Sequence, residues 1–232
     1  MSTDLKASKT VECTKCLEDS DGFLKCASLE VLGDISEEKI GKTFPKGSHV
    51  FLSGDESKGV YCISEGVVKI YYSGEAGKDH LLRVAGKGDI LGYRAMLSGE
   101  PYKASAIAAE PVKACFISKE TFHDSLKKDP EMAISLLGKL SREFGGAESR
   151  LSSVTDKEAA RRVAESLLFL KASFPDHPWT RKDIAEWAST TPETVMRVLA
   201  KFTDKNYIRS EGRRIVIVDE KSLGKIALIS EE

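Results

Sequence analysis

The chain has 232 residues, 41% hydrophobic and 31% charged, which is typical of one large or two ordinary globular domains. Its net charge of −1 excludes a whole-protein field that would attract nucleic acid or membrane, so such a partner needs a local patch. No apolar run approaches the ~20 residues of a membrane helix, and the N-terminus has no apolar signal-peptide core. We therefore expect a cytoplasmic protein with reduced thiols.

The first 27 residues form a polar segment that bears cysteines. Within it, "CTKCLEDSDGFLKC" holds Cys13, Cys16 and Cys26, three of the five cysteines in the chain. An odd number of cysteines and a reducing compartment argue against a disulfide framework. Metal ligation, redox sensing and plain packing stay open for these thiols. Cys62 lies in the strand-like stretch "VYCISEG" and is interpreted as a small core residue.

Residues 28–125 are predicted to form a β domain. Short apolar runs such as "GVVKIYY" and "VKACFIS" have strand length, and glycines bound them at regular spacing, which indicates a barrel, roll or sandwich. In "VKACFIS" the alternation places Lys113 and Cys115 on the face opposite Val112, Ala114 and Phe116.

Residues 126–155 are predicted to be helical, after a short helix that ends at Pro130. Here "EMAISLLGKLSREF" forms one apolar stripe that contains Met132, Leu136, Leu137, Leu140 and Phe144. Such a stripe either covers the β domain or pairs with its copy in a second subunit. Its place between two domains favours a dimerisation helix. The pair Gly145-Gly146 costs ~1 kcal/mol per glycine relative to alanine, which would make the pairing marginal and switchable.

Residues 156–232 contain a helix–turn–helix pattern in "TRKDIAEWASTTPETVMRVLAKF". Thr180 can cap the first helix, and Ile184, Ala185 and Ala188 can face inward. Thr191 can cap the second helix, with Pro192 at its first position. The second helix is apolar on one face (Val195, Val198, Leu199 and Phe202) and polar on the other (Glu193, Met196, Arg197 and Lys201). Such a helix suits reading of a DNA major groove.

A β hairpin is predicted after this pattern, in "YIRSEGRRIVIV", with its turn at Glu211-Gly212. Residues 171–218 hold nine Lys/Arg and six Asp/Glu, so the segment is +3 in a chain that is −1. The sign fits DNA, although a winged helix can also serve protein contacts alone. Phosphate contacts are expected from a set of side chains on the helices and hairpin: Thr180, Thr191, Thr194, Lys201, Arg209, Arg213 and Arg214.

A glycine-punctuated β domain, a long helix and a winged helix–turn–helix, in that order, resemble the Crp/Fnr family of bacterial transcription regulators. The resemblance covers about residues 40–225 and rests on "FPKGSHVFLSGD", "VYCISEGVVKIYY", "GKGDILGYRAMLSG" and "TTPETVMRVLAKF". It implies an α+β fold with a cyclic-nucleotide-binding-like β-roll, a dimerisation helix and a DNA-binding domain. It also implies a homodimer on palindromic DNA, with RNA polymerase as a further partner.

The family's recognition helix typically reads E-T-[VI]-x-R, which places base reading on Glu193 and Arg197 and implies a TGA half-site core. Met196 stands where the Fnr subgroup has serine, and could make only apolar contact, for instance with a thymine methyl. Ser189 replaces the glycine that is common in the turn.

Members that bind cyclic nucleotides carry a glutamate after the glycine that Gly92 represents, and an arginine about ten residues later. Here Tyr93 takes the glutamate position, and Lys103 is the nearest cation in "PYKASAIA". Lysine cannot pair with phosphate bidentately, so a cyclic nucleotide is not the expected ligand. "GDILGYRAMLSG" is closer to the Fnr version.

Members that resemble Fnr bind a [4Fe-4S] cluster through three N-terminal cysteines and one in the β domain. The resemblance places these roles on Cys13, Cys16, Cys26 and Cys115. Against this, nine residues separate Cys16 from Cys26, and the stretch is acidic. Zinc, a thiol redox switch and no metal role are the alternatives.

Two other classes of function compete with a DNA-binding regulator. A metalloenzyme built on a glycine-rich roll would need clustered histidines, whereas the four histidines of this chain are scattered and no catalytic motif is present. We therefore expect no enzyme activity. The other rival is a regulatory module that binds another protein through its helix. The two tryptophans, Trp179 and Trp187, are interpreted as core residues.

Overall fold

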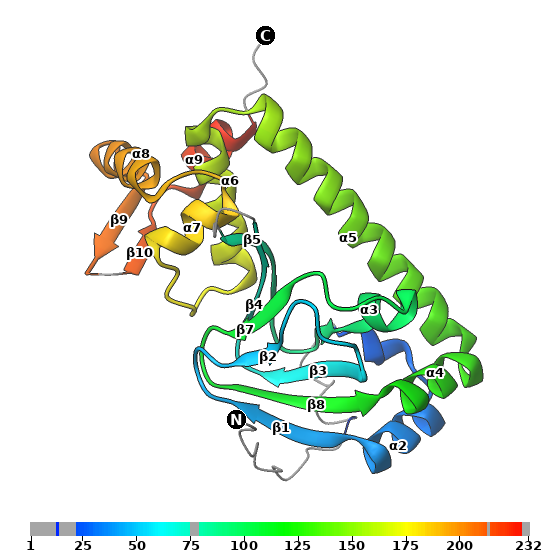
Figure 1. Ribbon diagram of the computed structural model, residues 1–232. Coiled ribbons are helices and arrows are strands. Elements are labelled where there is room, and N and C mark those ends of the chain that lie inside the picture. Colours follow the sequence, from blue (N-terminus) through cyan, green and yellow to red (C-terminus); the bar gives the residue numbers. More distant parts are fainter. Residues whose placement is uncertain (1–12, 14–21, 75–78, 213, 229–232) are drawn as a thin grey trace. The chain divides into compact units, whose positions relative to one another are not determined.

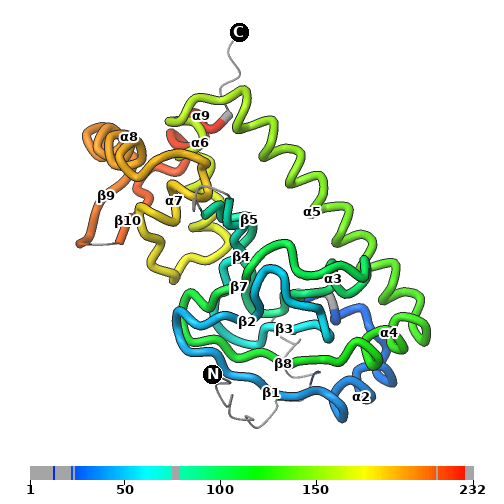
Figure 2. The backbone as a smooth tube through the Cα atoms, in the orientation of Figure 1, coloured from blue at the N-terminus to red at the C-terminus, as the bar shows by residue number. Residues whose placement is uncertain are grey.

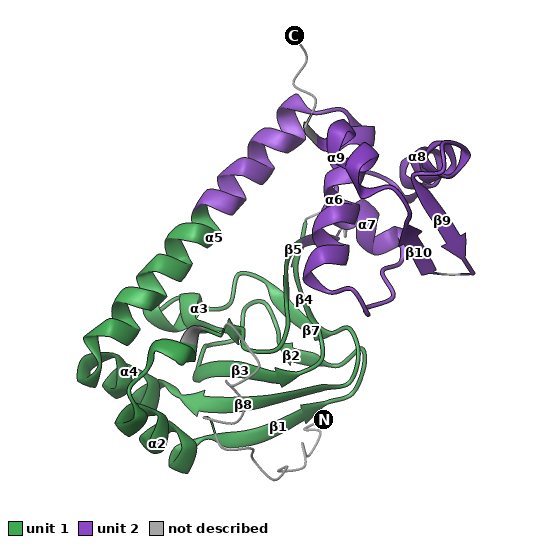
Figure 3. Ribbon diagram, turned by 180° about the vertical axis from the view of Figure 1, so that it is seen from behind, with its two compact units in different colours: residues 1–78, 82–144 green, residues 79–81, 145–232 purple. Residues whose placement is uncertain are grey.

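The computed structural model describes residues 13, 22–74, 79–212 and 214–228 (Figure 1). The chain divides into two compact units, residues 1–78 with 82–144 and residues 79–81 with 145–232 (Figure 3). The division falls inside helix α5 (Pro130–Asp156). Among the described helices, none combines the length and apolar character needed to cross a membrane.

Two four-stranded sheets form the β domain of unit 1, although the first three residues of β5, 79–81, are grouped with unit 2. The first has the order β1 (Ile40–Phe44), β8 (Val112–Ser118), β3 (Gly59–Glu65) and β6 (Ile90–Leu91). The second has the order β2 (His49–Phe51), β7 (Ser105–Ala108), β4 (Val68–Ser73) and β5 (Asp79–Ala85). The order is not sequential in either sheet, as the tube in Figure 2 shows, so this is a roll rather than a meander.

The interior of the roll is an apolar cluster to which both sheets contribute. Val112 and Ala114 of β8 are buried in it, together with Ile63 of β3 and Ile70 of β4. Because side chains alternate along a strand, Cys115 points to the other face of the first sheet. The predicted alternation of "VKACFIS" is confirmed.

A second apolar cluster covers that other face. Short helices supply part of it: η1 (Phe23–Cys26), α2 (Leu29–Glu38), α3 (Tyr93–Ser98) and α4 (Lys119–Lys128). The thiols of Cys13 and Cys62 are buried in the same cluster. Ser28 and Ser118 cap α2 and α4 by accepting hydrogen bonds from backbone N–H groups three residues later, as expected for N-cap residues.

Helix α5 runs without interruption through Gly145 and Gly146, after the break at Pro130 that the sequence predicts. Its first turns pack on unit 1, with Met132 and Leu136 buried and Leu140 partly buried in the second cluster. Phe144, by contrast, is exposed.

The exposed large apolar side chains of α5 form a face that shares only Leu137 and Phe144 with the predicted dimer stripe. They are Ile134, Leu137, Phe144, Leu151 and Val154. Met132, Leu136 and Leu140 face their own chain, because the helix buries its most continuous apolar stripe against the roll. This corrects the predicted stripe, of which only Leu137 and Phe144 are exposed.

Unit 2 contains helices α6 (Ala159–Ser173), α7 (Arg181–Trp187), α8 (Pro192–Asp204) and α9 (Glu220–Leu228), and strands β9 (Ile208–Glu211) and β10 (Arg214–Ile217). Leu167 and Leu170 of α6 are buried, and the Trp179 indole N–H donates to the Leu170 carbonyl at 3.0 Å. The prediction that Trp179 is a core residue is confirmed.

Candidate nucleic-acid interface and sensor roll

Helix α7 starts at a reciprocal cap. The Asp183 N–H donates to the Thr180 hydroxyl at 3.1 Å, and the Thr180 N–H donates to the Asp183 carboxylate at 3.0 Å. Two N–H groups that would otherwise lack helical partners are thus satisfied, which fixes where the helix begins. Ile184, Ala185 and Ala188 are buried, as the pattern predicts.

The turn between α7 and α8 uses a left-handed residue. Ser189 has a φ of 50°, and the next N–H, that of Thr190, donates to the Ala185 carbonyl at 2.9 Å. The turn therefore keeps the conformation that glycine usually provides, rather than widening to relieve the serine.

Helix α8 is fixed at its start and along one side. The Thr191 hydroxyl accepts from the Thr194 N–H at 3.3 Å, and Pro192 follows at the first helical position. Val195, Val198, Leu199 and Phe202 are buried. The predicted inward face is confirmed, and it sets the rotation of the helix.

The outward face of α8 holds Glu193, Met196, Arg197 and Lys201, all exposed. Positions i, i+3, i+4 and i+8 fall on one side of a helix, so the four side chains share a surface. Hydrogen bonds from the Glu193 backbone N–H and the Thr191 hydroxyl lower the pKa of Glu193. An ionised Glu193 can accept from cytosine N4, and Arg197 can bridge guanine O6 and N7.

Strands β9 and β10 are antiparallel, with Ile208 paired with Ile217 at one end and Glu211 paired with Arg214 at the other. Glu211 is therefore still in the paired strand, so the turn begins at Gly212, one residue later than predicted, and Gly212 has a φ of 62° that suits glycine. Arg213 lies outside the described residues. Arg209 is exposed and paired with Glu211 at 2.6 Å, while Arg214 lies 4.0 Å from Asp176.

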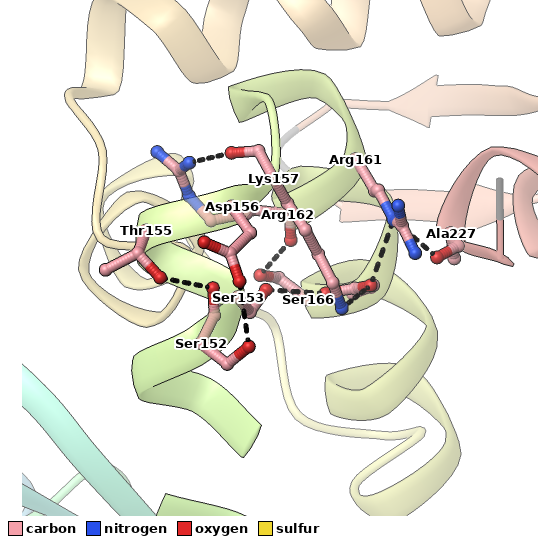
Figure 4. A network of polar contacts seen from close by, with 10 residues as sticks. Ser152, Ser153, Thr155, Asp156, Lys157, Arg161, Arg162, Ser166 and Ala227 are labelled. Carbon is pink, nitrogen blue, oxygen red and sulfur yellow. Dashed lines mark hydrogen bonds and ion pairs between the residues drawn. The ribbon is translucent and has the colours of Figure 1, made fainter. Parts of the chain in front are cut away.

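A polar network joins the end of α5 to α6 and, through Arg161 and the Ala227 carbonyl, to α9 (Figure 4). The Arg162 guanidinium donates to the carbonyl of Lys157, just after α5, and through Nε to the carbonyl of Ala188 at 2.9 Å. Lys157 and Ser153 both bond Glu165, at 2.6 and 3.1 Å. Arg162 thus holds the residue that ends α7.

A second arginine of unit 2 contacts α7 through an aromatic ring. The Arg150 guanidinium of α5 lies 4.2 Å from the ring centre of Trp187, and Phe169 of α6 stacks on that ring at 4.7 Å. Burial lowers the pKa of Arg150. Sequence reasoning missed Arg150 and Arg162, because neither belongs to a motif and only the packing of α5, α6 and α7 reveals their roles.

In unit 1, Tyr93 is turned toward helix α5. It is 1% exposed, and its hydroxyl donates to the Glu143 carboxylate at 2.5 Å. Burial and this bond raise the pKa of Tyr93. Arg83 binds both Glu143 at 2.8 Å and Asp89 at 3.2 Å, and Lys139 binds Asp89 at 3.0 Å. Tyr93, which stands where nucleotide-binding members have the ribose-binding glutamate, therefore helps to link the roll to helix α5.

Aromatic side chains occupy the roll near the expected phosphate position. Tyr102 stacks on Phe51 with ring centres 3.9 Å apart, and Phe51 lies against Tyr61 at 6.3 Å. Burial raises the pKa of Tyr61 to about 12. Lys103 is largely exposed, and its ammonium pairs with the Glu100 carboxylate at 2.8 Å.

The described candidate ligands of the cluster, Cys13, Cys26 and Cys115, do not lie together at one site. Cys13 is buried, and the Lys39 ammonium donates to its sulfur at 3.1 Å. Cys26 is exposed, Cys115 is half-buried, and Cys16 lies outside the described residues. Within the described part of the chain, no three His, Cys, Asp or Glu side chains meet at a metal-sized site. The three described thiols therefore form no metal site among themselves, and the four-thiolate cluster stays a prediction.

Comparison with known proteins gives the family. The cyclic nucleotide-binding domain family matches residues 41–129, and the Crp-like helix-turn-helix domain family matches residues 161–226. The Fumarate and nitrate reduction regulatory protein of Vibrio cholerae is 28% identical over 215 residues, covering 89% of this chain and 85% of the relative. The CRP-like cAMP-activated global transcriptional regulator of Mycobacterium tuberculosis is 28% identical over 193 residues, covering 79% and 86%.

The solved structure of FixK2 from Bradyrhizobium japonicum has the same fold, with a TM-score of 0.74 at 21% identity, covering 83% of this chain and 98% of that one. The equal identities to the two kinds of relative do not separate the Fnr from the cAMP-binding subgroup. With a cyclic nucleotide-binding-like roll followed by a Crp-like helix–turn–helix, the chain belongs to the Crp/Fnr family of transcription regulators.

Proposed function

We propose that this regulator binds DNA as a homodimer on a palindromic site, with α8 of each copy in a major groove. One observation carries the proposal: Glu193, Met196 and Arg197 share an exposed face of a helix whose opposite face is buried and whose start is capped. A rigid helix with acceptor, apolar and bidentate donor groups on one face can distinguish base pairs.

Phosphate contacts are proposed for the side chains around that face. Thr180, Thr191 and Lys201 are exposed near the two helices, and Arg209 and Arg214 are exposed on the hairpin. Because Arg209 already pairs with Glu211, contact with a phosphate requires exchange of that pair. Thr194 and Arg213 complete the proposed set.

Dimerisation is proposed through the exposed face of α5. Leu137, Phe144 and Leu151 recur every seven residues, and each is more than 60% exposed. Ile134 precedes Leu137 by three positions, which gives the a and d spacing of a two-stranded coiled coil. A second copy of the same helix is the partner that this spacing fits.

Base reading is tested with Arg197→Ala. We expect a loss of roughly 1–3 kcal/mol in binding to a TGA-type palindrome and nearly unchanged binding to random DNA, because only the specific complex uses the guanine contact. Fluorescence anisotropy at several salt concentrations measures both.

The matched control is Lys201→Ala on the same face, which should weaken binding to both DNAs and reduce the salt dependence. Equal losses of specific and random binding in the Arg197 variant would contradict the base-reading role. If the wild-type protein bound neither the palindrome nor random DNA, the proposed DNA-binding function would be wrong.

The signal that reaches the roll is not assigned to an iron–sulfur cluster. A cluster on Cys13, Cys16, Cys26 and Cys115 stays a prediction from the resemblance, and the described thiols do not support it. A small ligand in the roll is the alternative. The inward-stacked Tyr102 and the α5-bound Tyr93 favour a ligand other than a cyclic nucleotide.

A further inference from the structure

Two cysteines lie side by side on the first sheet of unit 1. Cys62 of β3 is the direct cross-strand partner of Cys115 of β8. On its other side, Cys115 pairs with Gly41 of β1, and Cys62 pairs on its other side with Ile90 of β6. Directly paired residues project to the same face, so both thiols point toward the cluster that buries Cys62 and Ile90.

The backbone bonds show which kind of pair this is. The Asp89 carbonyl accepts from the Ile63 N–H at 2.9 Å, and the Ile63 carbonyl accepts from the Gly88 N–H at 2.8 Å. Backbone groups alternate sides along a strand, so those of Cys62 point the other way, toward β8. Hydrogen-bonded pairs of this type have Cα atoms roughly 5.5 Å apart. That separation is inside the ~4.4–6.8 Å range of disulfides.

Closing the bond requires a small inward movement. Directly opposed Cβ atoms are about 4.5–5.5 Å apart in a sheet, whereas bridged cysteines need about 3.8 Å. A disulfide here is therefore strained, and strained disulfides are the readily reduced, regulatory ones. Gly41 has no side chain to crowd Cys115, which is half-buried, while Cys62 is 7% exposed.

We propose that Cys62 and Cys115 form a reversible disulfide when the protein meets a hydroperoxide. The less buried Cys115 thiol reacts first: its sulfur takes one peroxide oxygen and becomes a sulfenic acid, the O–O bond breaks, and the other oxygen leaves as water from hydrogen peroxide or as an alcohol from an organic hydroperoxide. The Cys62 sulfur then displaces the sulfenic hydroxyl, which leaves as water with the proton of the Cys62 thiol. The two sulfurs together lose two electrons, and the peroxide oxygens gain them.

The disulfide between Cys62 and Cys115 would affect helix α5 through side-chain packing. Cys62 shares its cluster with Met132 and Leu136, the residues that seat α5 on the roll. Movement of the Cys62 sulfur toward β8 withdraws it from this cluster, which is close-packed and responds to such a change. Oxidation is therefore expected to weaken the seating of α5.

The test uses the full chain, reduced and with its iron content measured as negligible. Hydrogen peroxide is added, remaining thiols are alkylated with N-ethylmaleimide, and the protein is digested for mass spectrometry. We expect two of the five thiols to be lost, a cross-linked peptide pair containing Cys62 and Cys115, and full recovery of both thiols with dithiothreitol.

Cys26→Ser, which removes an exposed thiol, is the control and should leave the cross-link intact. Cys62→Ala and Cys115→Ser should each abolish it. The idea is overturned if Cys115 joins another cysteine, or becomes a sulfinic acid while Cys62 is still alkylated. Wild-type mapping decides this even where Cys62→Ala does not fold. Disulfide formation is independent of the proposed DNA binding, so failure of either leaves the other standing.

Discussion

Ser189 holds a backbone conformation that an L-residue with a side chain disfavours. Its φ of 50° lies in the turn that sets α8 relative to α7, and the Thr190 N–H that follows is bonded to Ala185. The turn between α7 and α8 needs a residue in the left-handed conformation at this position. The backbone strain at Ser189 is therefore retained rather than relieved by a wider turn.

Ser189→Gly is expected to raise the free energy of unfolding by roughly 0.5–1 kcal/mol, because glycine adopts positive φ without steric cost and loses only part of that gain to unfolded-state entropy. Urea unfolding measures it. Asn206→Gly is the matched control, since Asn206 has a φ of 56° but asparagine tolerates it better. An equal or larger gain in the control would show that Ser189 is unstrained.

Helix α5 is the element that carries residues of both units, and its middle contains Gly145 and Gly146. A Cβ atom built on either glycine meets nothing within 4 Å, so no close packing demands them. Their effect is instead on helix stability, because glycine lowers it by ~1 kcal/mol per site relative to alanine. The boundary between the two units falls between Phe144 and Gly145.

Gly145→Ala combined with Gly146→Ala is expected to stiffen α5 and shift the monomer–dimer balance toward dimer, by up to ~1 kcal/mol per glycine. Analytical ultracentrifugation measures the balance. Gly138→Ala on the same helix is the control, placed away from the boundary, where its Cβ would lie 3.4 Å from the Arg142 guanidinium. An unchanged balance and signal response in the double variant would show that the glycines do not tune pairing.

For the whole molecule, the decisive question is which face of α5 meets a partner. The chain exposes Leu137 at 63% and Leu151 at 69%, while it buries Leu136 at 3%. Such large exposed apolar side chains on one helix mark a contact surface when they recur at coiled-coil spacing.

Leu137→Glu is therefore expected to move the protein to monomer and to weaken palindrome binding, while leaving the circular-dichroism spectrum of the monomer intact. The charge would be buried without a partner at the helix pair. Ser149→Glu adds the same charge to an exposed position of α5 off the stripe and should leave the dimer in place. A Leu137 variant that remains dimeric would place the interface elsewhere.

The local pattern of the sequence determined much of this protein. The capped helices, the inward and outward faces of α8 and the alternation around Cys115 were predicted, because each depends on neighbours within a few residues. The resemblance of "TTPETVMRVLAKF" to a recognition helix predicted the family, which the comparisons confirm.

Only the tertiary structure decided the features that depend on residues far apart in the chain. The stripe of Met132 and Leu136 looks like a dimer seam in sequence, yet it packs on the roll, because periodicity gives the apolar face and not its partner. The bond from Tyr93 to Glu143 and the pairing of Cys62 with Cys115 each span some fifty residues. Strand pairing and helix docking set such contacts, and no local pattern encodes them.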